Sequence, residues 1–170
     1  DELVCLKPEH THTAECFPDK TVDTETTADW LKTLEHITIT NNLSENLVAV
    51  ATSQVGYSES DRNYEYNAFA EKNNYTRYGE WYGSPYGEWN TMFVSFCIDH
   101  ANINNSDLLT SASAESMRQA WDKKYVYYSA ESYDGERGDV VFFDTDANGK
   151  ADRTGIVIYR SDNLLMVIEG

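Results

Sequence analysis

Two thiols and two imidazoles lie close together near the start of the chain, at Cys5, His10, His12 and Cys16. Two Cys and two His side chains form one of the usual ligand sets of a tetrahedral structural zinc site. The spacing differs, however, from the common C-x2-C arrangement. A Cys5–Cys16 disulfide is the alternative, and export from the cell would favour it. The sequence therefore predicts either a zinc site or a disulfide in this segment.

A second group of candidate metal ligands lies in the stretch DTDANGKAD, residues 144–152. Side-chain oxygens at positions 1, 3, 5 and 9, with glycine at position 6, match the first part of a calcium-binding loop. The four oxygen-bearing residues are Asp144, Asp146, Asn148 and Asp152. The twelfth position, where a bidentate glutamate is expected, is Gly155. A polar β-hairpin turn with Asn148-Gly149 at its tip explains the same pattern, and we favour it over weak calcium binding.

The third thiol, Cys97, lies in the most hydrophobic stretch of the chain, with His100 one helical turn further on. Both residues belong to one predicted helix, on a face turned towards the core. A buried cysteine usually behaves as a small hydrophobic side chain. We therefore expect Cys97 to be a core thiol rather than half of a Cys97–His100 nucleophilic pair.

The composition indicates a folded and strongly acidic protein. The chain of 170 residues is 41% hydrophobic and carries a formal net charge of −16. This charge disfavours binding to nucleic acid or to anionic membranes, because both interactions need Lys and Arg side chains. No stretch approaches the roughly 20 apolar residues that span a bilayer. We expect no nucleic-acid partner and no membrane insertion, and the beginning at Asp1 and end at Gly170 suggest a piece of a longer protein.

Three segments are expected to position these residues. Residues 1–18 form the Cys/His-rich segment, residues 19–43 a polar linker with a short helix, and residues 44–170 a single domain. Hydrophobic spacing and turn residues predict helices over 29–35, 44–56, 64–72, 89–103 and 112–123, the first two capped by Asp29 and Ser44. The predicted strands cover residues 139–143, 155–159 and 164–168. This order predicts an α+β fold, with N-terminal helices packed on a small antiparallel sheet.

From about Leu47 onward, four sequence runs follow one another in the order found in a known family. They are AVATSQVGYSES, NYTRYGEWYGSPYGEWNTMFVSFC, GDVVFFDTDANGKADRTGIVIY and the final MVIEG. Residues 47–170 thereby resemble the CHAP domain, the papain-like cysteine amidase or endopeptidase of peptidoglycan hydrolases. The resemblance implies a papain-like fold with a cysteine nucleophile directly after Trp89. It also implies a histidine just before the GIV run and an acidic partner on the next strand.

The chain departs from the family pattern at two of these three positions. Asn90 stands where the cysteine is expected and Arg153 where the histidine is expected, whereas the carboxylate is retained as Glu169. An amide is a poor nucleophile, and arginine cannot shuttle protons near neutral pH because its pKa lies above about 12. We therefore predict a catalytically inactive domain, a pseudoenzyme. Asn90 is expected to cap the helix that it begins, and Arg153 to pair with Glu169 across the strands.

The resemblance also implies what the domain binds and where. Aromatic side chains suit sugars, peptide stems and protein partners. Four of them are expected to line the former substrate cleft: Tyr78, Trp81, Tyr82 and Tyr86. The predicted function is an inactive CHAP-like domain that binds peptidoglycan or a cell-surface protein, in an extracellular or cell-wall protein of a Gram-positive-like bacterium.

The N-terminal segment agrees with that location. Its pattern LVC…EHTHT…CF is similar to a Cys/His-rich repeat of Gram-positive surface proteins. Two alternative functions stay open: an active peptidoglycan amidase or endopeptidase, and a structural spacer or adhesin module. The aromatic residues and the metal-ligand patterns are compatible with all three functions, so the residues at the three family positions are the main reason to favour an inactive domain.

Overall fold

The computed structural model describes residues 8–170, apart from residues 12, 14–15, 104–109 and 125. Cys5 and His12, two of the four predicted zinc ligands, thus lie outside the described residues. The fold is of mixed α and β class, with helices and small antiparallel sheets, and this agrees with the predicted α+β class. Within the described residues, no helix is both long and apolar enough to cross a membrane.

Helix α1 spans Thr27–Thr33 and begins two residues before the predicted start. Asp29 lies in its first turn, where the carboxylate accepts hydrogen bonds from the N–H and the hydroxyl of Thr26, at 2.7 and 2.8 Å. Thr26 is therefore the N-cap residue, and the prediction that Asp29 caps this helix is wrong. The helix presents Trp30 to the hydrophobic core.

Helix α2 spans Leu43–Ser53, close to the predicted range. Its N-cap is Asn42, whose side-chain oxygen accepts a hydrogen bond from the N–H of Glu45 at 3.2 Å. The prediction that Ser44 caps this helix is wrong, because Asn42 supplies an equally good acceptor two residues earlier. The buried face of α2 is formed by Asn46, Leu47, Val48, Val50 and Ala51.

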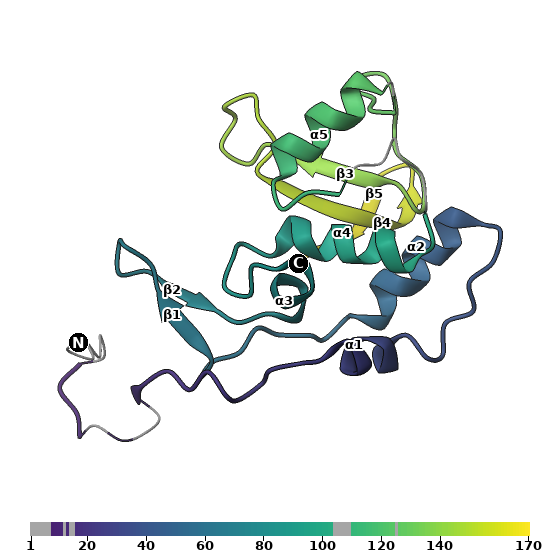
Figure 1. Ribbon diagram of the computed structural model, residues 1–170. Coiled ribbons are helices and arrows are strands. Elements are labelled where there is room, and N and C mark those ends of the chain that lie inside the picture. Colours follow the sequence, from purple (N-terminus) through teal and green to yellow (C-terminus); the bar gives the residue numbers. More distant parts are fainter. Residues whose placement is uncertain (1–7, 12, 14–15, 104–109, 125) are drawn as a thin grey trace.

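A β-hairpin replaces the helix predicted over residues 64–72. Strand β1 (Tyr64–Tyr66) pairs antiparallel with β2 (Lys72–Asn74). The Asn67 side chain closes the turn by accepting hydrogen bonds from two N–H groups, one of them that of Glu71. Such local side-chain bonding competes with helix formation, which the Ala, Glu and Lys residues of this stretch otherwise favour. The hairpin projects away from the rest of the molecule (Figure 1).

Helix α4 (Asn90–His100) lies at the centre of the core, and nearly all of its residues are buried. It packs against α2, against β4 and against α3 (Arg77–Tyr82). Helix α5 (Ala114–Lys123) follows, as predicted, and its Trp121 contacts Phe142 edge-on. These contacts place the beginning of α4 beside the beginning of β4.

The three predicted strands are confirmed as one antiparallel sheet. They are β3 (Val140–Phe143), β4 (Arg153–Ser161) and β5 (Leu164–Ile168). The central strand is β4, and its Ile156 pairs with Val140 on one side and with Ile168 on the other. Because β4 and β5 are joined by a short turn, the first residue of β4 and the residues after β5 lie at the same end of the sheet (Figure 1).

Candidate functional site

Asn90 is the first residue of α4, and its side chain bonds to the sheet rather than to its own helix. Its Oδ1 accepts hydrogen bonds from the N–H and the hydroxyl of Thr154, at 2.7 and 3.1 Å. Its Nδ2 donates to the carbonyl oxygens of Thr154 and Gly170, at 3.0 and 3.2 Å. Trp89 occupies the N-cap position, so the prediction that Asn90 caps α4 is wrong. We call Asn90, Thr154 and Gly170 the Asn90 clamp.

Arg153 and Glu169 form the predicted ion pair. The Arg153 Nε lies 2.9 Å from Glu169 Oε2, and the guanidinium also donates to the Gly170 carbonyl at 3.1 Å. Both side chains are partly exposed to solvent, so the pair holds the ends of β4 and β5 together without a large contribution to stability. The prediction that these two residues pair across the strands is confirmed.

The structure thus brings together the three positions that the sequence singles out. Asn90 and the Arg153–Glu169 pair share a partner, the carbonyl of Gly170. Sequence reasoning missed Thr154, which is fully buried and faces Asn90. The one available signal was its place next to Arg153, because successive side chains of a strand point to opposite faces.

Two close approaches in this region require glycine. At Gly155, a Cβ atom would lie 2.2 Å from a methyl carbon of Val167 on the neighbouring strand. At Gly170, it would lie 2.9 Å from the Trp89 ring. The Trp89 ring therefore packs directly on the last residue of the chain, and the beginning of α4 and the end of the sheet form one tightly packed unit.

The side chains of the Asn90 clamp and of the Arg153–Glu169 pair offer a limited range of chemistry. An amide, a guanidinium and a carboxylate are present, and all the hydrogen-bonding capacity of the Asn90 amide is used inside the clamp. Neither Asn90 nor Arg153 can act as the nucleophile or as the proton carrier of a cysteine hydrolase.

Cys97 and His100 are not a substitute for the missing pair. Cys97 is a free thiol that is fully buried, and this burial raises its pKa well above the usual value. The His100 ring stacks on Phe96 at a centroid distance of 4.1 Å, and its Nδ1 lies 3.0 Å from the Phe96 carbonyl oxygen. The thiol is therefore a core group, as expected from its hydrophobic surroundings.

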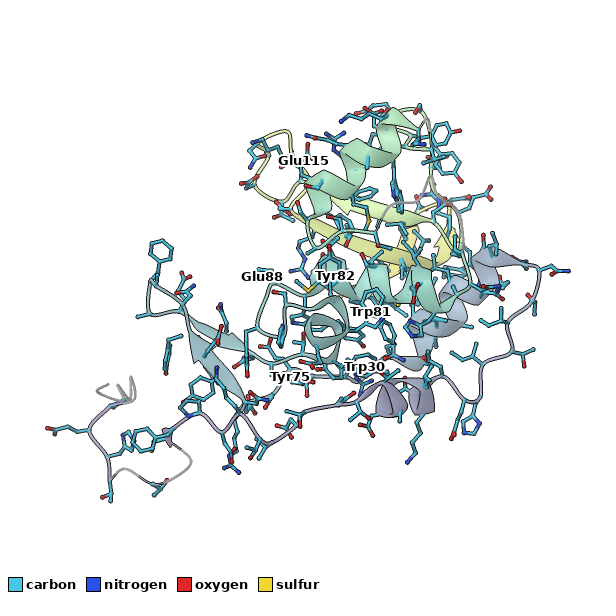
Figure 2. All side chains as sticks on the ribbon, viewed as in Figure 1. Trp30, Tyr75, Trp81, Tyr82, Glu88 and Glu115 are labelled. Atoms are coloured by element: carbon cyan, nitrogen blue, oxygen red, sulfur yellow. The ribbon has the colours of Figure 1, made fainter. Side chains whose placement is uncertain are left out.

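The four aromatic residues expected in the cleft have different environments. Tyr78 is buried and stacks on Trp89 at 5.4 Å, so it belongs to the core. Trp81 is half-buried against Phe96, whereas Tyr82 is 40% exposed. Figure 2 shows Trp81, Tyr82 and Glu88 around the end of α3. Tyr82 is thus the most accessible of the four residues near this helix.

Tyr86, the fourth of these residues, lies on the side of the hairpin. Its hydroxyl donates to the Asn63 side chain at 2.8 Å, and the Lys20 ammonium lies 4.7 Å from the centre of its ring. One face of the ring is therefore in contact with the protein's own cation.

Glu59 is a second residue that sequence reasoning missed. Its carboxylate accepts hydrogen bonds from the Trp89 indole at 3.2 Å and from the Asn74 amide at 2.7 Å. It therefore connects the beginning of α4 with the hairpin. Glu59 also lines a cavity of about 690 Å³, whose other walls include Tyr57, Tyr75 and Arg77. Residues 53–62 form most of the wall of this cavity.

The loop between β3 and β4 brings together three of the four predicted calcium ligands. Carboxylate oxygens of Asp144, Asp146 and Asp152 all lie within 4.8 Å of one another and are exposed. The fourth predicted ligand, Asn148, turns its side-chain oxygen to the N–H of Lys150 at 2.9 Å. The loop's own N–H groups bond to the carboxylates, which is the pattern of a polar turn.

The predicted zinc segment is described in part. His10 Nε2 lies 3.1 Å from the Cys16 sulfur, which also accepts a hydrogen bond from the N–H of Thr13. These two contacts, the Thr13 hydrogen bond first, lower the pKa of the Cys16 thiol to about 7. Because thiolate is the form that binds metals, this pair suits a zinc site. Cys5 and His12 lie outside the described residues, so zinc and disulfide both stay predictions.

No family model, no curated protein and no solved structure matches this chain. A functional proposal therefore depends on the chain's own residues and their geometry.

Proposed function

We propose that this chain is a catalytically inactive domain with a CHAP-like, papain-type fold, and that it binds peptidoglycan or a protein partner in the bacterial cell wall or outside the cell. The observation that carries the proposal is the Asn90 clamp together with the Arg153–Glu169 pair. Asn90, Arg153 and Glu169, the three positions that the resemblance singles out, are linked through the Gly170 carbonyl and the Arg153–Glu169 pair. The Asn90 amide bonds to Thr154 and Gly170, and the Arg153 guanidinium bonds to Glu169 and Gly170.

This arrangement supports binding over catalysis for a physical reason. A thiolate at a helix start is stabilised by the helix dipole and by a neighbouring imidazolium. Asn90 keeps the position at the helix start but has no ionisable group, and Arg153 keeps a positive charge that is neutralised by Glu169. The substitutions preserve the packing of the old site while removing the reaction.

Binding is tested with purified peptidoglycan sacculi. We expect the chain to co-sediment with sacculi in a saturable manner and to release no soluble muropeptides, as measured by chromatography. Tyr82→Ala is expected to reduce the bound fraction several-fold, because Tyr82 is exposed on α3 beside the site. Tyr128→Ala is the matched control, since Tyr128 is also exposed but follows α5.

Each alternative function has a distinct outcome in this experiment. Muropeptide release that is lost in the Glu169→Gln variant would show an active hydrolase and overturn the proposal. Absence of any binding to sacculi or to surface-protein extracts would favour the structural spacer. Equal loss of binding in the Tyr82 and Tyr128 variants would place the binding surface elsewhere on the molecule.

The resemblance itself is tested by restoring the missing residues. The double variant Asn90→Cys with Arg153→His is expected to acquire slow muropeptide release that a thiol-alkylating reagent abolishes. A correctly folded double variant without activity would contradict the assignment of these two positions. Thr154 rather than Arg153 faces Asn90, so a second variant that pairs Asn90→Cys with Thr154→His tests the alternative position.

A further inference from the structure

The chain that precedes and forms α1 lies on the domain in the manner of a bound peptide. We call residues 19–33 the strap. Three contacts hold its extended part: Asp19 N–H to the Arg62 carbonyl at 2.8 Å, Asn63 Nδ2 to the Val22 carbonyl at 3.0 Å, and Glu25 N–H to the Tyr75 hydroxyl at 2.9 Å. In Figure 1 the strap runs along the outside of the molecule, from the base of the hairpin to α1. Its partners all come from residues far along the chain, as those of a separate peptide would.

Two side chains anchor the strap. The Glu25 carboxylate lies 2.7 Å from the Arg77 guanidinium, which also donates to the Gln54 side chain at 3.1 Å. Only 15% of the Arg77 side chain is exposed, and its guanidinium lies 4.4 Å from the centre of the Tyr57 ring. Trp30 enters the hydrophobic core. Figure 2 shows Trp30 and Tyr75 along the line of the strap. A carboxylate followed by an aromatic side chain is thus the pattern that the groove binds.

The fit of the strap is incomplete. Among the described residues, three buried polar atoms at its contacts have no hydrogen-bond partner: Glu25 Oε2, Arg77 Nε and Trp30 Nε1. Asp23 has a positive φ of 56°, a conformation that non-glycine residues rarely adopt. Buried polar groups without partners oppose folding, because their hydration is lost without compensation. Opening of the strap relieves these defects, so its docking is weaker than its contact area suggests.

Hollow space lies on both sides of the Glu25–Arg77 pair. The 690 Å³ cavity and a second one of about 540 Å³ share Thr24, Glu25 and Arg77 as lining residues. The connection from α1 to α2 is exposed over residues 38–42, but the Asn46 side chain of α2 holds the N–H and the carbonyl of Thr40. Residues 38 and 39 are therefore the place where the chain can turn away while α2 stays in place. Departure of the strap would leave the Arg77 charge in the groove without its carboxylate, which favours rapid rebinding.

We propose that the strap is exchangeable, and that the groove at Arg77 binds the strap of a second copy of this chain. A second copy carries the same segment, with Glu25 five residues before Trp30, and this segment is complementary to the groove. Exchange of an identical element between two copies makes no new kind of contact and needs only that the connection be exposed. Because the strap is tethered to its own groove at an effective concentration of about millimolar, dimers form at comparable protein concentrations.

The groove is tested with the full chain and a fluorescent synthetic peptide of residues 17–38, by fluorescence anisotropy. Peptide and tethered strap compete for one groove, so the proposal predicts effects of opposite sign. Glu25→Gln in the chain weakens the competing strap and should raise peptide affinity about 10-fold. Glu25→Gln in the peptide should lower the affinity by about the same factor. Arg77→Gln in the chain weakens the peptide and the tethered strap alike, so on this chain the Glu25→Gln change in the peptide should no longer lower the affinity.

The matched control is Glu35→Gln, in chain and peptide separately. It removes the same charge from the same part of the chain, and although Glu35 also lines the smaller cavity, its carboxylate lies beside His36 at 3.4 Å rather than at Arg77. Neither substitution should change the affinity. Lack of saturable peptide binding to a folded Glu25→Gln chain, or equal effects of the Glu25 and Glu35 changes, would overturn the exchangeable strap.

The second copy is tested by sedimentation equilibrium of the full chain. Wild type should show a dimer fraction that increases up to about millimolar concentration, and Arg77→Gln, which weakens the tethered and the exchanged strap equally, should show a similar dimer fraction. A peptide that binds without any dimerisation would overturn the second copy as the partner and leave a groove for a foreign acidic peptide. Both measurements are independent of peptidoglycan binding, so their outcome does not depend on the proposed function.

Discussion

Asn90 has partners on two segments that lie 64 and 80 residues further along the chain. A cysteine at this position could not make those contacts, because a thiol is a weak donor and a weak acceptor. Four hydrogen bonds from one amide tie the start of α4 to β4 and to the end of the sheet. Asn90, whose amide is a poor nucleophile, is therefore also the residue that holds the start of α4 to the sheet.

Asn90→Ala should lower the free energy of unfolding by about 2–4 kcal/mol, because it leaves the buried N–H and carbonyl of Thr154 without partners. Urea denaturation at neutral pH measures the loss. Asn41→Ala, at an exposed asparagine of the α1–α2 connection, is the control and should change the stability by less than about 0.5 kcal/mol. If the two variants unfold at the same urea concentration, Asn90 does not clamp the helix to the sheet.

Glu115 is expected to make the protein sensitive to acid. Hydrogen bonds from Arg118, and then from the N–H of Ala151, lower its pKa from 4.5 to about 2. The unfolded chain therefore binds a proton at Glu115 at higher pH than the folded protein does. The stability that Glu115 contributes is complete above the unfolded pKa of 4.5 and is lost as the pH falls towards 2.

This contribution is measured as a difference between variants. Urea denaturation of wild type and Glu115→Gln between about pH 2 and pH 7 should give a stability gap that is largest near neutral pH and closes in acid. The same comparison with Glu88→Gln, an exposed carboxylate, controls for the general loss of charge. A gap that stays constant across this pH range would mean that the Glu115 carboxylate contributes no charge-dependent stability.

Contacts between neighbouring strands, such as the Arg153–Glu169 pair, were predicted correctly. Contacts that depend on how α4 packs on the sheet, such as that between Asn90 and Thr154, were missed. The Arg153–Glu169 pair joins neighbouring strands of one antiparallel sheet, and the sequence places both residues at strand ends. Thr154 could be recognised as a partner of Asn90 only after α4 had been placed on β4. The cap of α2 was missed by two residues because Asn42 and Ser44 are nearly equal as N-cap residues.

At the scale of elements, the strands were predicted better than the N-terminal helices and turns. Residues 164–168 were placed correctly because a run of branched and apolar residues between polar turns is an unambiguous strand signal. The stretch from Tyr64 to Lys72 contains both aromatic residues and good helix formers, so periodicity alone could not assign it. The Asn67 side chain decides the matter by closing a turn. A helix at α4 was predicted because its central residues, 92–98, are apolar or small, although the predicted range 89–103 is longer than the observed Asn90–His100.

We expect the loop between β3 and β4 to be a polar turn, because its own N–H groups bond to its carboxylates. The alternative is weak calcium binding by the three exposed carboxylates that lie within 4.8 Å of one another. Its Kd would be no tighter than roughly 10⁻⁴ M, because the position of the bidentate glutamate is Gly155. Isothermal titration with CaCl₂ measures the affinity, and Asp146→Asn should weaken it.

Asp162→Asn is the matched control for this titration, since Asp162 is an exposed aspartate in the turn between β4 and β5. It should leave the calcium affinity unchanged. Absence of a binding isotherm in wild type, or equal weakening in both variants, would mean that the loop is a polar turn without a specific cation site.

At the scale of the whole molecule, the strap packs on residues 44–170, although the sequence predicts it to be a linker outside that domain. Residues 19–43 have the polar, Thr-rich composition of a linker, and their contacts with residues 54–77 are too distant in sequence to be predicted. The apolar residues of this region are few, but Trp30, Leu34 and Ile37 all pack on the core. A segment of linker-like composition therefore contributes to the same hydrophobic core as α4.

This integration predicts the effect of truncation. Deletion of residues 1–43 removes a buried tryptophan, for which truncation to alanine alone costs about 3–5 kcal/mol, and leaves Arg77 without its carboxylate. The remaining 44–170 fragment should lose at least about 4 kcal/mol, a large part of the total stability of a small domain. Asn41→Ala, at an exposed residue of the same segment, is the control and should leave the unfolding midpoint unchanged. The strap peptide of residues 17–38, added to the 44–170 fragment, should raise its thermal midpoint in a saturable manner, because a ligand that binds the folded state stabilises it by mass action. A fragment as stable as the full chain, with no response to the peptide, would show that residues 19–43 act thermodynamically as a linker and that their contacts with Arg77 and the core contribute nothing to folding.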